Sequence, residues 1–184
     1  MTPTETALIV AVPETEPAVG HHRSALDVAA GWGVPAHVTV LYPFLPPDRI
    51  TDEVLAELSV ICAAVPRFDV SFTEVRWFGD TVVWLAPDPD DGFRRLTSAV
   101  WRRFPEAAPY GGAHAEVVPH LTIGHDGPRQ ALAEAAEAVA GQLPIRASVE
   151  AVRLLAGAPV PGGWRPLHEF ALGAGQPARA AGQP

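Results

Sequence analysis

Two tetrapeptides constrain the fold of this 184-residue chain more than any other feature. The segments His37–Val40 (HVTV) and His120–Ile123 (HLTI) repeat one pattern, a histidine, an apolar residue, a threonine and an apolar residue, 83 positions apart. Alternate side chains of a β-strand point to opposite faces, so each histidine is expected beside its threonine, with the apolar residues in a core behind them. Two such strands facing one another would hold a phosphate group and carry out the two proton transfers that a reaction at phosphorus needs.

The residues before each tetrapeptide strengthen the match. Val34-Pro35 leads into the first copy and Val118-Pro119 into the second. A single His-x-Thr is common by chance, whereas two copies with matching apolar positions and proline-marked approaches indicate internal duplication. Because there are only two copies and their spacing is long, the pattern favours a repeated half-fold over a short solenoid array.

The two tetrapeptides resemble the motifs of the 2H phosphoesterase superfamily, and Ala36–Phe44 (AHVTVLYPF) resembles its 2′-5′ RNA ligase-like branch. This resemblance implies a two-lobed, pseudo-symmetric α+β fold, with antiparallel sheets and flanking helices around a central cleft. It implies chemistry on 2′,3′-cyclic phosphates, 2′-5′ phosphodiester bonds or similar nucleotide phosphodiesters. It also implies His37 and His120 as catalytic residues, and Thr39 and Thr122 as phosphate-binding residues.

The residue types suit such chemistry. Opening a cyclic phosphate needs a base for water and an acid for the leaving ribose oxygen, and imidazole serves as either near neutral pH. Threonine hydroxyls donate to the nonbridging oxygens, where negative charge builds. We hypothesise that His120 activates water and His37 protonates the leaving oxygen. An RNA ligase uses the same groups with their acid and base roles exchanged, so a ligase is an alternative to the phosphodiesterase. A nucleotide-binding protein without turnover is a third alternative.

No cofactor and no metal are expected. Imidazole suits zinc, copper or nickel, and the histidines at 37, 114, 120 and 125 are candidates to converge on an ion. However, the sequence has no H-x-x-x-H helix pair, no C-x-x-C and no carboxylate inside either motif. The pairing of histidine with threonine suits phosphate better than a metal.

Composition narrows the partners. The chain is 48% apolar, enough for a folded core, and its thirteen basic residues, all arginine, stand against 21 acidic ones for a net charge of −8. We therefore expect a small nucleotide or an RNA terminus as the partner, with no long nucleic-acid tract and no membrane partner. The protein itself is expected to be a monomer. The lone Cys62, the absence of a run of ~20 apolar residues and the lack of a basic leader predict a cytoplasmic location.

Hydrophobic periodicity predicts alternating helices and strands. Helices are expected over 19–30, after Pro46-Pro47 with Asp48 as the cap, over 93–104, and from Pro128 to Gly141. Strands are expected over 7–12, 37–40, 68–72, 81–86, 117–125, 145–155 and 168–172, with a hairpin turn at Gly79-Asp80. This alternation also fits a parallel doubly wound sheet, although no glycine-rich phosphate loop follows the first strand.

The expected organisation is one domain over residues 1–173, made of two interlocked lobes, with a flexible tail over 174–184. The loop 105–115 is predicted to form a mobile rim near the second motif. Candidates for stacking a nucleobase are Trp32, Tyr42, Trp84 and Trp164. Alternation directs Tyr42 toward the core unless Pro43 turns the chain, and a mid-strand position favours core packing for Trp84.

The remaining polar candidates have weaker support. His125 is five positions after His120, so regular alternation places it on the opposite face, and it reaches the site only if the strand bends. His114 lies in the rim loop. Arg23 is a candidate to reach the cleft from the first helix. Surface positions are expected for His21, His22 and His168 and for the arginines at 94, 95, 102 and 103.

Overall fold

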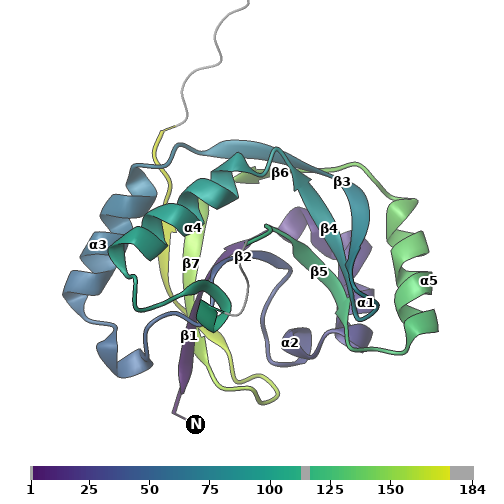
Figure 1. Ribbon diagram of the computed structural model, residues 1–184, viewed down its shortest axis with the longest axis horizontal. Helices are drawn as coiled ribbons and strands as arrows, with labels where there is room; N and C mark the ends of the chain where they lie inside the picture. Colours follow the sequence, from purple (N-terminus) through teal and green to yellow (C-terminus); the bar gives the residue numbers. More distant parts are fainter. Residues whose placement is uncertain (1, 113–116, 175–184) are drawn as a thin grey trace, which may run out of the picture.

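One eight-stranded sheet organises the molecule. The computed structural model describes residues 2–112 and 117–174, and its strands follow the order β6-β3-β4-β5-β2-β1-β7-β8. Every neighbouring pair of strands in that order is antiparallel. The sheet curls strongly, with helices outside it (Figure 1). The expected α+β class is confirmed, and the parallel doubly wound alternative is wrong.

The strands have the following bounds: β1 Glu5–Ala11, β2 His37–Leu41, β3 Phe68–Phe78, β4 Val82–Asp88, β5 Leu121–His125, β6 Ile145–Val149, β7 Ala151–Gly157 and β8 Arg165–Ala171. The helices are α1 Glu16–Leu26, α2 Val28–Gly31, α3 Asp52–Ala63, α4 Asp91–Arg103 and α5 Arg129–Ala140. Short 3₁₀ turns occupy Pro13–Thr15 and Pro47–Arg49.

The sheet divides into two halves of four strands. We call β1, β2, β7 and β8 lobe 1, and β3, β4, β5 and β6 lobe 2; β2 and β5 join them. Helix α3 packs against β8 and α4 against β2, so both cover lobe 1. Helices α1 and α5 pack against β5 and cover lobe 2 (Figure 1). Each lobe is therefore covered partly by a helix whose neighbours in the chain belong to the other lobe.

Two helix predictions needed correction. The helix expected over 19–30 is two helices, because Asp27 adopts an extended conformation and its side chain accepts a hydrogen bond from the backbone N–H of Ala29, capping α2. The helix expected after Asp48 begins at Asp52 instead, with Thr51 as its cap. The helices predicted over 93–104 and 128–141 are confirmed as α4 and α5.

The strand predictions were wrong at several ends and merged two strands in one place. Strand β8 begins at Arg165, before the expected residue 168, and β5 begins at Leu121, after the expected residue 117. Strand β3 continues past residue 72 to Phe78, and the hairpin turn at Gly79-Asp80 follows it as predicted. The strand expected over 145–155 is two strands separated by Glu150. Strand β6 pairs with β3 in lobe 2, whereas β7 pairs with β1 in lobe 1, so the chain crosses between lobes at this residue.

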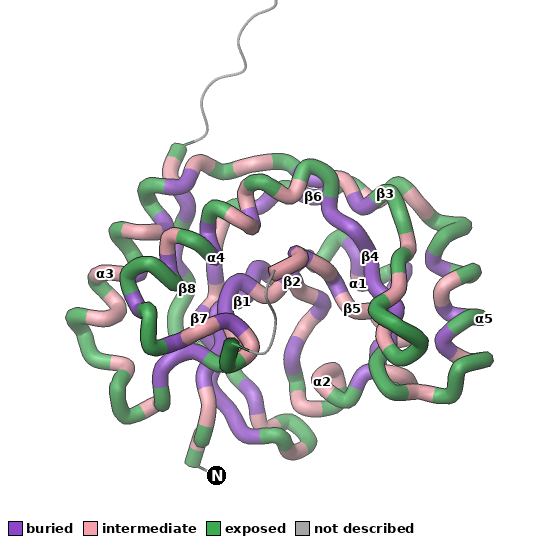
Figure 2. Tube along the Cα trace, in the orientation of Figure 1, coloured by how far each residue is buried: buried purple, intermediate pink, exposed green. Residues whose placement is uncertain are grey.

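The main core lies between the sheet and the four longer helices, as the buried segments in Figure 2 show. Burying a large aliphatic side chain stabilises a fold by about 1.5–3 kcal/mol, so this layer anchors the strands from behind. Cys62 lies in this core as a free thiol, and burial raises its pKa to about 11. A smaller cluster, on the opposite face of lobe 1, is formed by Ala7, Ile9, Val34, Leu155 and Trp164.

Candidate active site

The two motif strands lie side by side at the centre of the sheet. Val38 on β2 pairs with Leu121 on β5, and both side chains are fully buried in the main core. The next apolar residue of each motif is also buried, whereas the histidines and threonines are half-buried. The alternation predicted from the sequence is therefore confirmed for both motifs.

This register arranges the four polar residues as a square. In an antiparallel pair with Val38 opposite Leu121, His37 lies across from Thr122 and Thr39 across from His120. The two imidazoles occupy one diagonal and the two hydroxyls the other. Diagonal neighbours of this kind are roughly 7–8 Å apart, which leaves room for a phosphate between the rings. We call these four residues the motif square.

Both imidazoles are oriented in the same way. Nδ1 of His37 lies 2.8 Å from the carbonyl oxygen of Pro35, and Nδ1 of His120 lies 2.8 Å from that of Val118. Because a carbonyl oxygen only accepts, each Nδ1 carries the hydrogen. Nε2 is then the atom that gains or loses a proton. The proline-marked approaches thus fix the tautomer of both histidines.

A β-bulge follows the first motif. The ladder between β1 and β2 steps from Thr39 directly to Leu41, so Val40 is an extra residue. The extra residue shifts the alternation of side chains by one position. Tyr42 therefore points to the same face as Thr39, where it lines the central cavity. The Tyr42 hydroxyl donates to Glu5 at 2.7 Å. Burial, together with this contact, raises the pKa of Tyr42 to about 12.

A second bulge occurs at the equivalent place in β5. The ladder to β4 steps from Thr122 to Gly124, which leaves Ile123 unpaired and returns His125 to the face of the motif square. His125 lines the central cavity, and its Nε2 lies 3.3 Å from Oδ2 of Asp126. The strand therefore bends in the way that a site position for His125 required.

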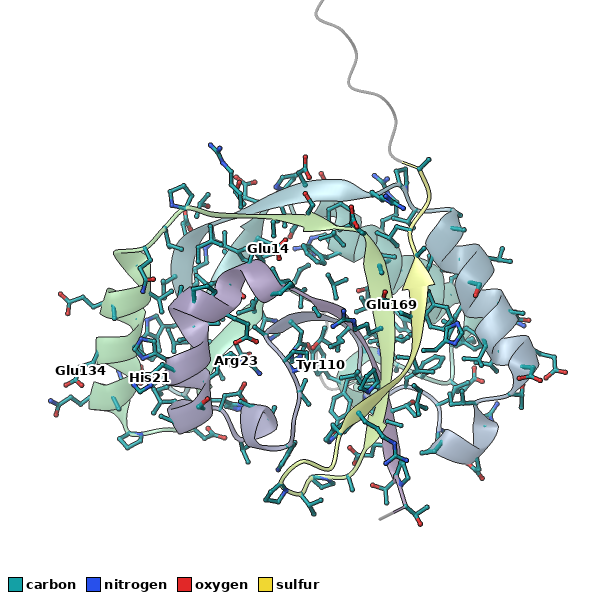
Figure 3. All side chains as sticks on the ribbon, turned by 180° about the vertical axis from the view of Figure 1, so that it is seen from behind. Glu14, His21, Arg23, Tyr110, Glu134 and Glu169 are labelled. Atoms are coloured by element: carbon teal, nitrogen blue, oxygen red, sulfur yellow. The ribbon has the colours of Figure 1, made fainter. Side chains whose placement is uncertain are left out.

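His37 is held against a buried ion pair. Arg23 on α1 is only 2% exposed, and its guanidinium donates to Oδ2 of Asp27 at 2.9 and 3.2 Å and to the carbonyl of Val34 at 3.2 Å. Asp27 lines the cavity, whereas Arg23, labelled on α1 in Figure 3, contacts the site through Asp27. Burial, reinforced by the Arg23 charge, lowers the pKa of His37 to about 4.

His120 has aromatic neighbours instead. Its ring lies 5.0 Å from the ring of Phe78 at an interplanar angle of 89°, and 5.9 Å from that of Trp84 at 67°. Phe78 and Trp84 stack on one another at 4.5 Å. Trp84 is buried, as its mid-strand position favoured; it pairs with Thr122 and so lies on the face of the motif square, beside His120.

Tyr110 is a site residue that the sequence did not reveal. Its backbone N–H donates to the carbonyl of Tyr42 at 2.6 Å, and its hydroxyl makes a hydrogen bond with Thr39. Burial raises the pKa of Tyr110, which keeps the phenol protonated. The described part of the rim loop thus reaches the first motif, and Tyr110 lines the cavity that both motifs share. Tyr110 lies toward the middle of the molecule (Figure 3).

The motif square opens into a cavity of about 780 Å³, within the range of small-molecule sites. Among the described residues that line it, Asp27 is the one carboxylate, and none is an arginine. The lining consists of Asp27, Ala29, His37, Thr39, Tyr42, Trp77, Phe78, Gly79, Val82, Tyr110, Val118, His120, Thr122 and His125.

Among the described residues, the other predicted candidates do not line the central cavity. Trp32 and Trp164 line a smaller apolar cavity of about 120 Å³, which His37 and Thr39 of the motif square also line. His114 lies outside the described residues. The following side chains do not line the central cavity: His21, His22, His168, Arg94, Arg95, Arg102 and Arg103. Within residues 2–112 and 117–174, no group of three or more histidine, cysteine or acidic side chains is placed to hold a metal ion.

Comparison with known proteins places this site in a family. The model of the 2′-5′ RNA ligase superfamily matches residues 12–158, most of the chain. The chain belongs to this superfamily. A Geobacillus kaustophilus (strain HTA426) protein, GK0864, which carries the provisional name of a phosphoesterase, is 30% identical over 98 residues. That match covers 52% of this chain and 54% of GK0864, about half the length of each protein.

Solved structures show the superfamily fold over nearly the whole chain. The Thermus thermophilus protein TT0787 superposes with a TM-score of 0.66 at 18% identity, covering 92% of this chain and 98% of that one. Escherichia coli LigT complexed with 3′-AMP gives a TM-score of 0.59 at 20% identity, covering 93% and 99%. These likenesses confirm the two-lobed fold. Across the part of the chain that the structure describes, no helix has the length and apolar character needed to cross a bilayer.

Proposed function

We propose that this superfamily member is a metal-independent phosphodiesterase that acts on 2′,3′-cyclic phosphates or 2′-5′ phosphodiester bonds of nucleotides or RNA ends. The observation that carries the proposal is the motif square, in which two imidazoles with fixed tautomers face each other diagonally across two hydroxyls. That arrangement supplies a base and an acid on opposite sides of one phosphorus, as in-line displacement requires.

The environment of the histidines supports one assignment of their roles. A pKa of about 4 leaves His37 neutral at neutral pH, so Nε2 of His37 accepts the proton of the attacking water. The water oxygen bonds to phosphorus while the bond from phosphorus to the ribose oxygen breaks. His120 donates the proton that the leaving oxygen needs. This assignment is the reverse of the one hypothesised from the sequence, which had no access to the burial of His37.

The hydroxyls stabilise the charge that develops on phosphorus. Thr39 and Thr122 donate to the nonbridging oxygens, and Tyr110 adds a protonated phenol beside Thr39. The scheme needs no metal ion because side chains supply both proton transfers and the oxyanion contacts. A nucleotide bound to E. coli LigT, a protein of the same fold, supports a nucleotide-sized substrate.

A phosphodiesterase assay in the presence of EDTA tests the proposal. The substrates are 2′,3′-cyclic nucleotides and a 2′-5′-linked dinucleotide, and the proteins are wild type, His37→Ala, His120→Ala and the control His168→Ala, whose histidine is exposed outside the cavity. We expect turnover to survive the chelator, to fall about 10²–10⁴-fold in each motif variant and to stay unchanged in the control.

Two results would contradict the proposal. Turnover that disappears with the chelator would require a metal, and full turnover in His37→Ala and His120→Ala would remove the square from the chemistry. Wild-type protein that binds the nucleotides without turning them over would instead favour the binding-protein alternative. Joining of RNA ends would favour the ligase alternative, against which the lack of arginine in the described lining argues.

A further inference from the structure

The side of the cavity next to His120 presents an aromatic ring to solvent. The end of the β3–β4 hairpin contributes Trp77, Phe78, Gly79 and Val82 to the lining. Phe78 is 36% exposed, one of the few large apolar side chains on the described surface. An exposed aromatic ring inside a concave site is typical of a surface that binds a ligand.

Two other rings pack against the Phe78 ring. Trp84 stacks against it at 4.5 Å with an angle of 23°, and the ring of His120 meets it edge to face at 5.0 Å. Despite these contacts Phe78 keeps 36% of its surface exposed, and it lines the cavity. Two stacked rings held by the core form a rigid support for a third flat ring.

The described charged side chains nearby offer no partner for a second phosphate on this side of the cavity. The arginines close to the hairpin have anionic partners: Arg76 pairs with Glu74 at 2.7 Å, and Arg129 pairs with Asp80. Neither lines the cavity. A second phosphate on this side would find no arginine among the described lining residues, whereas an aromatic base would find a stacking partner.

We propose that Phe78 is the stacking platform for the nucleobase of the substrate, which lies on the side of the leaving ribose oxygen. This inference rests on the proposed function and adds the organic group that the site selects. His120 protonates the ribose oxygen, and the ribose carries its base toward the hairpin that packs on His120. The substrate is therefore a phosphodiester with a single negative charge and a flat ring.

Paired substrates separate stacking from structural support. Adenosine 2′,3′-cyclic phosphate carries a base, and glycerol 1,2-cyclic phosphate has the same reacting group without one. In Phe78→Ala, we expect KM for the adenosine ester to rise about tenfold or more, because base–aromatic stacking has that magnitude, and KM for the glycerol ester to change less than about twofold. Phe78→Tyr keeps the ring and should restore KM. Trp101→Ala, which truncates an exposed aromatic residue on α4 outside the cavity, should match wild type.

An equal loss on both esters in Phe78→Ala would show that Phe78 only supports His120 and would overturn the platform, and so would unchanged KM on both. Failure of the proposed function is a different result, in which wild-type protein turns over neither ester. The platform is then tested alone by calorimetric binding of adenosine 2′,3′-cyclic phosphate. An affinity about tenfold weaker in Phe78→Ala sustains it, and equal affinities overturn it.

Discussion

The two motif strands have the same internal geometry and different surroundings. In β2 and in β5, the histidine Nδ1 lies 2.8 Å from the carbonyl oxygen two residues before it, and a bulge follows the threonine by one residue. Each bulge adds a third side chain to the site face, Tyr42 in one strand and His125 in the other. Duplication therefore accounts for the symmetric part of the site.

The surroundings make the two histidines unequal. His37 lies against the buried Arg23–Asp27 pair, and burial lowers its pKa to about 4. His120 instead packs against the rings of Phe78 and Trp84. The comparison teaches that a repeated motif supplies two equivalent imidazoles, and that the elements packed around each copy give them different environments. In the proposed mechanism, that difference separates the base from the acid.

The largest expected effect comes from breaking the ion pair behind the first motif. In Arg23→Ala, the Asp27 carboxylate loses its charged partner in a buried position, so the free energy of unfolding should fall by about 3–5 kcal/mol. The double variant Arg23→Met/Asp27→Leu removes both charges and should fall much less. Urea denaturation measures the free energy of unfolding of both variants. An equal fall in the two variants would show that the unpaired charge of Asp27 is not the cause of the lost stability.

The threonines should behave alike, because symmetry places each across from a histidine. Thr39→Val and Thr122→Val keep the shape and remove a donor to a charged oxygen, which is worth about 1.5–3 kcal/mol, so kcat should fall about 10- to 150-fold in each. Steady-state kinetics measures this loss. A large loss in one variant alone would break the symmetric part of the comparison.

The pH profile tests the asymmetric part. A base works when neutral, so the ascending limb of kcat/KM should lie near pH 4, and protonation of the base should no longer limit kcat/KM above pH 5. A descending limb at higher pH reports loss of the proton that His120 donates. At pH 5 a histidine with a pKa of about 4 is roughly 90% neutral, against roughly 3% for an ordinary histidine of pKa ~6.5. An acid limb near pH 6.5 in the kcat/KM profile would mean that the environment of His37 does not set the base.

The smallest effect is expected at Tyr110, which contacts the threonine of the first motif. Tyr110→Phe removes one neutral hydroxyl donor, worth about 0.5–1.5 kcal/mol, so kcat should fall about two- to twelvefold. The loss should vanish when Tyr110→Phe is combined with Thr39→Val, because the two hydroxyls act together. Additive losses in this double-mutant cycle would separate Tyr110 from Thr39.

The sequence predicted the residues whose position depends on local alternation. His37 with Thr39, and His120 with Thr122, share a face because they are two residues apart in strands, and nothing else is needed to place them. The break at Asp27 was also accessible, since an aspartate before a short apolar run is a common helix cap.

The remaining site residues depend on contacts between distant segments. The positions of Tyr42 and His125 follow from bulges whose existence depends on the registers with β1 and β4. Tyr110 reaches Thr39 from a loop, and Phe78 reaches His120 only because β3 extends to the cavity. The single-domain boundary at residue 173 and the flexible tail stay predictions.

The most direct test of the division of labour uses two leaving groups. A 2′-5′-linked dinucleotide needs protonation of its leaving ribose oxygen, whereas the corresponding 2′-(4-nitrophenyl phosphate) ester of the nucleoside releases a stable phenolate that needs none. We predict that His120→Ala loses about 10²–10⁴-fold in kcat/KM on the dinucleotide but less than about tenfold on the aryl ester, and that His37→Ala loses that much on both. Rescue of His37→Ala by the aryl ester, with no rescue of His120→Ala, would contradict the account.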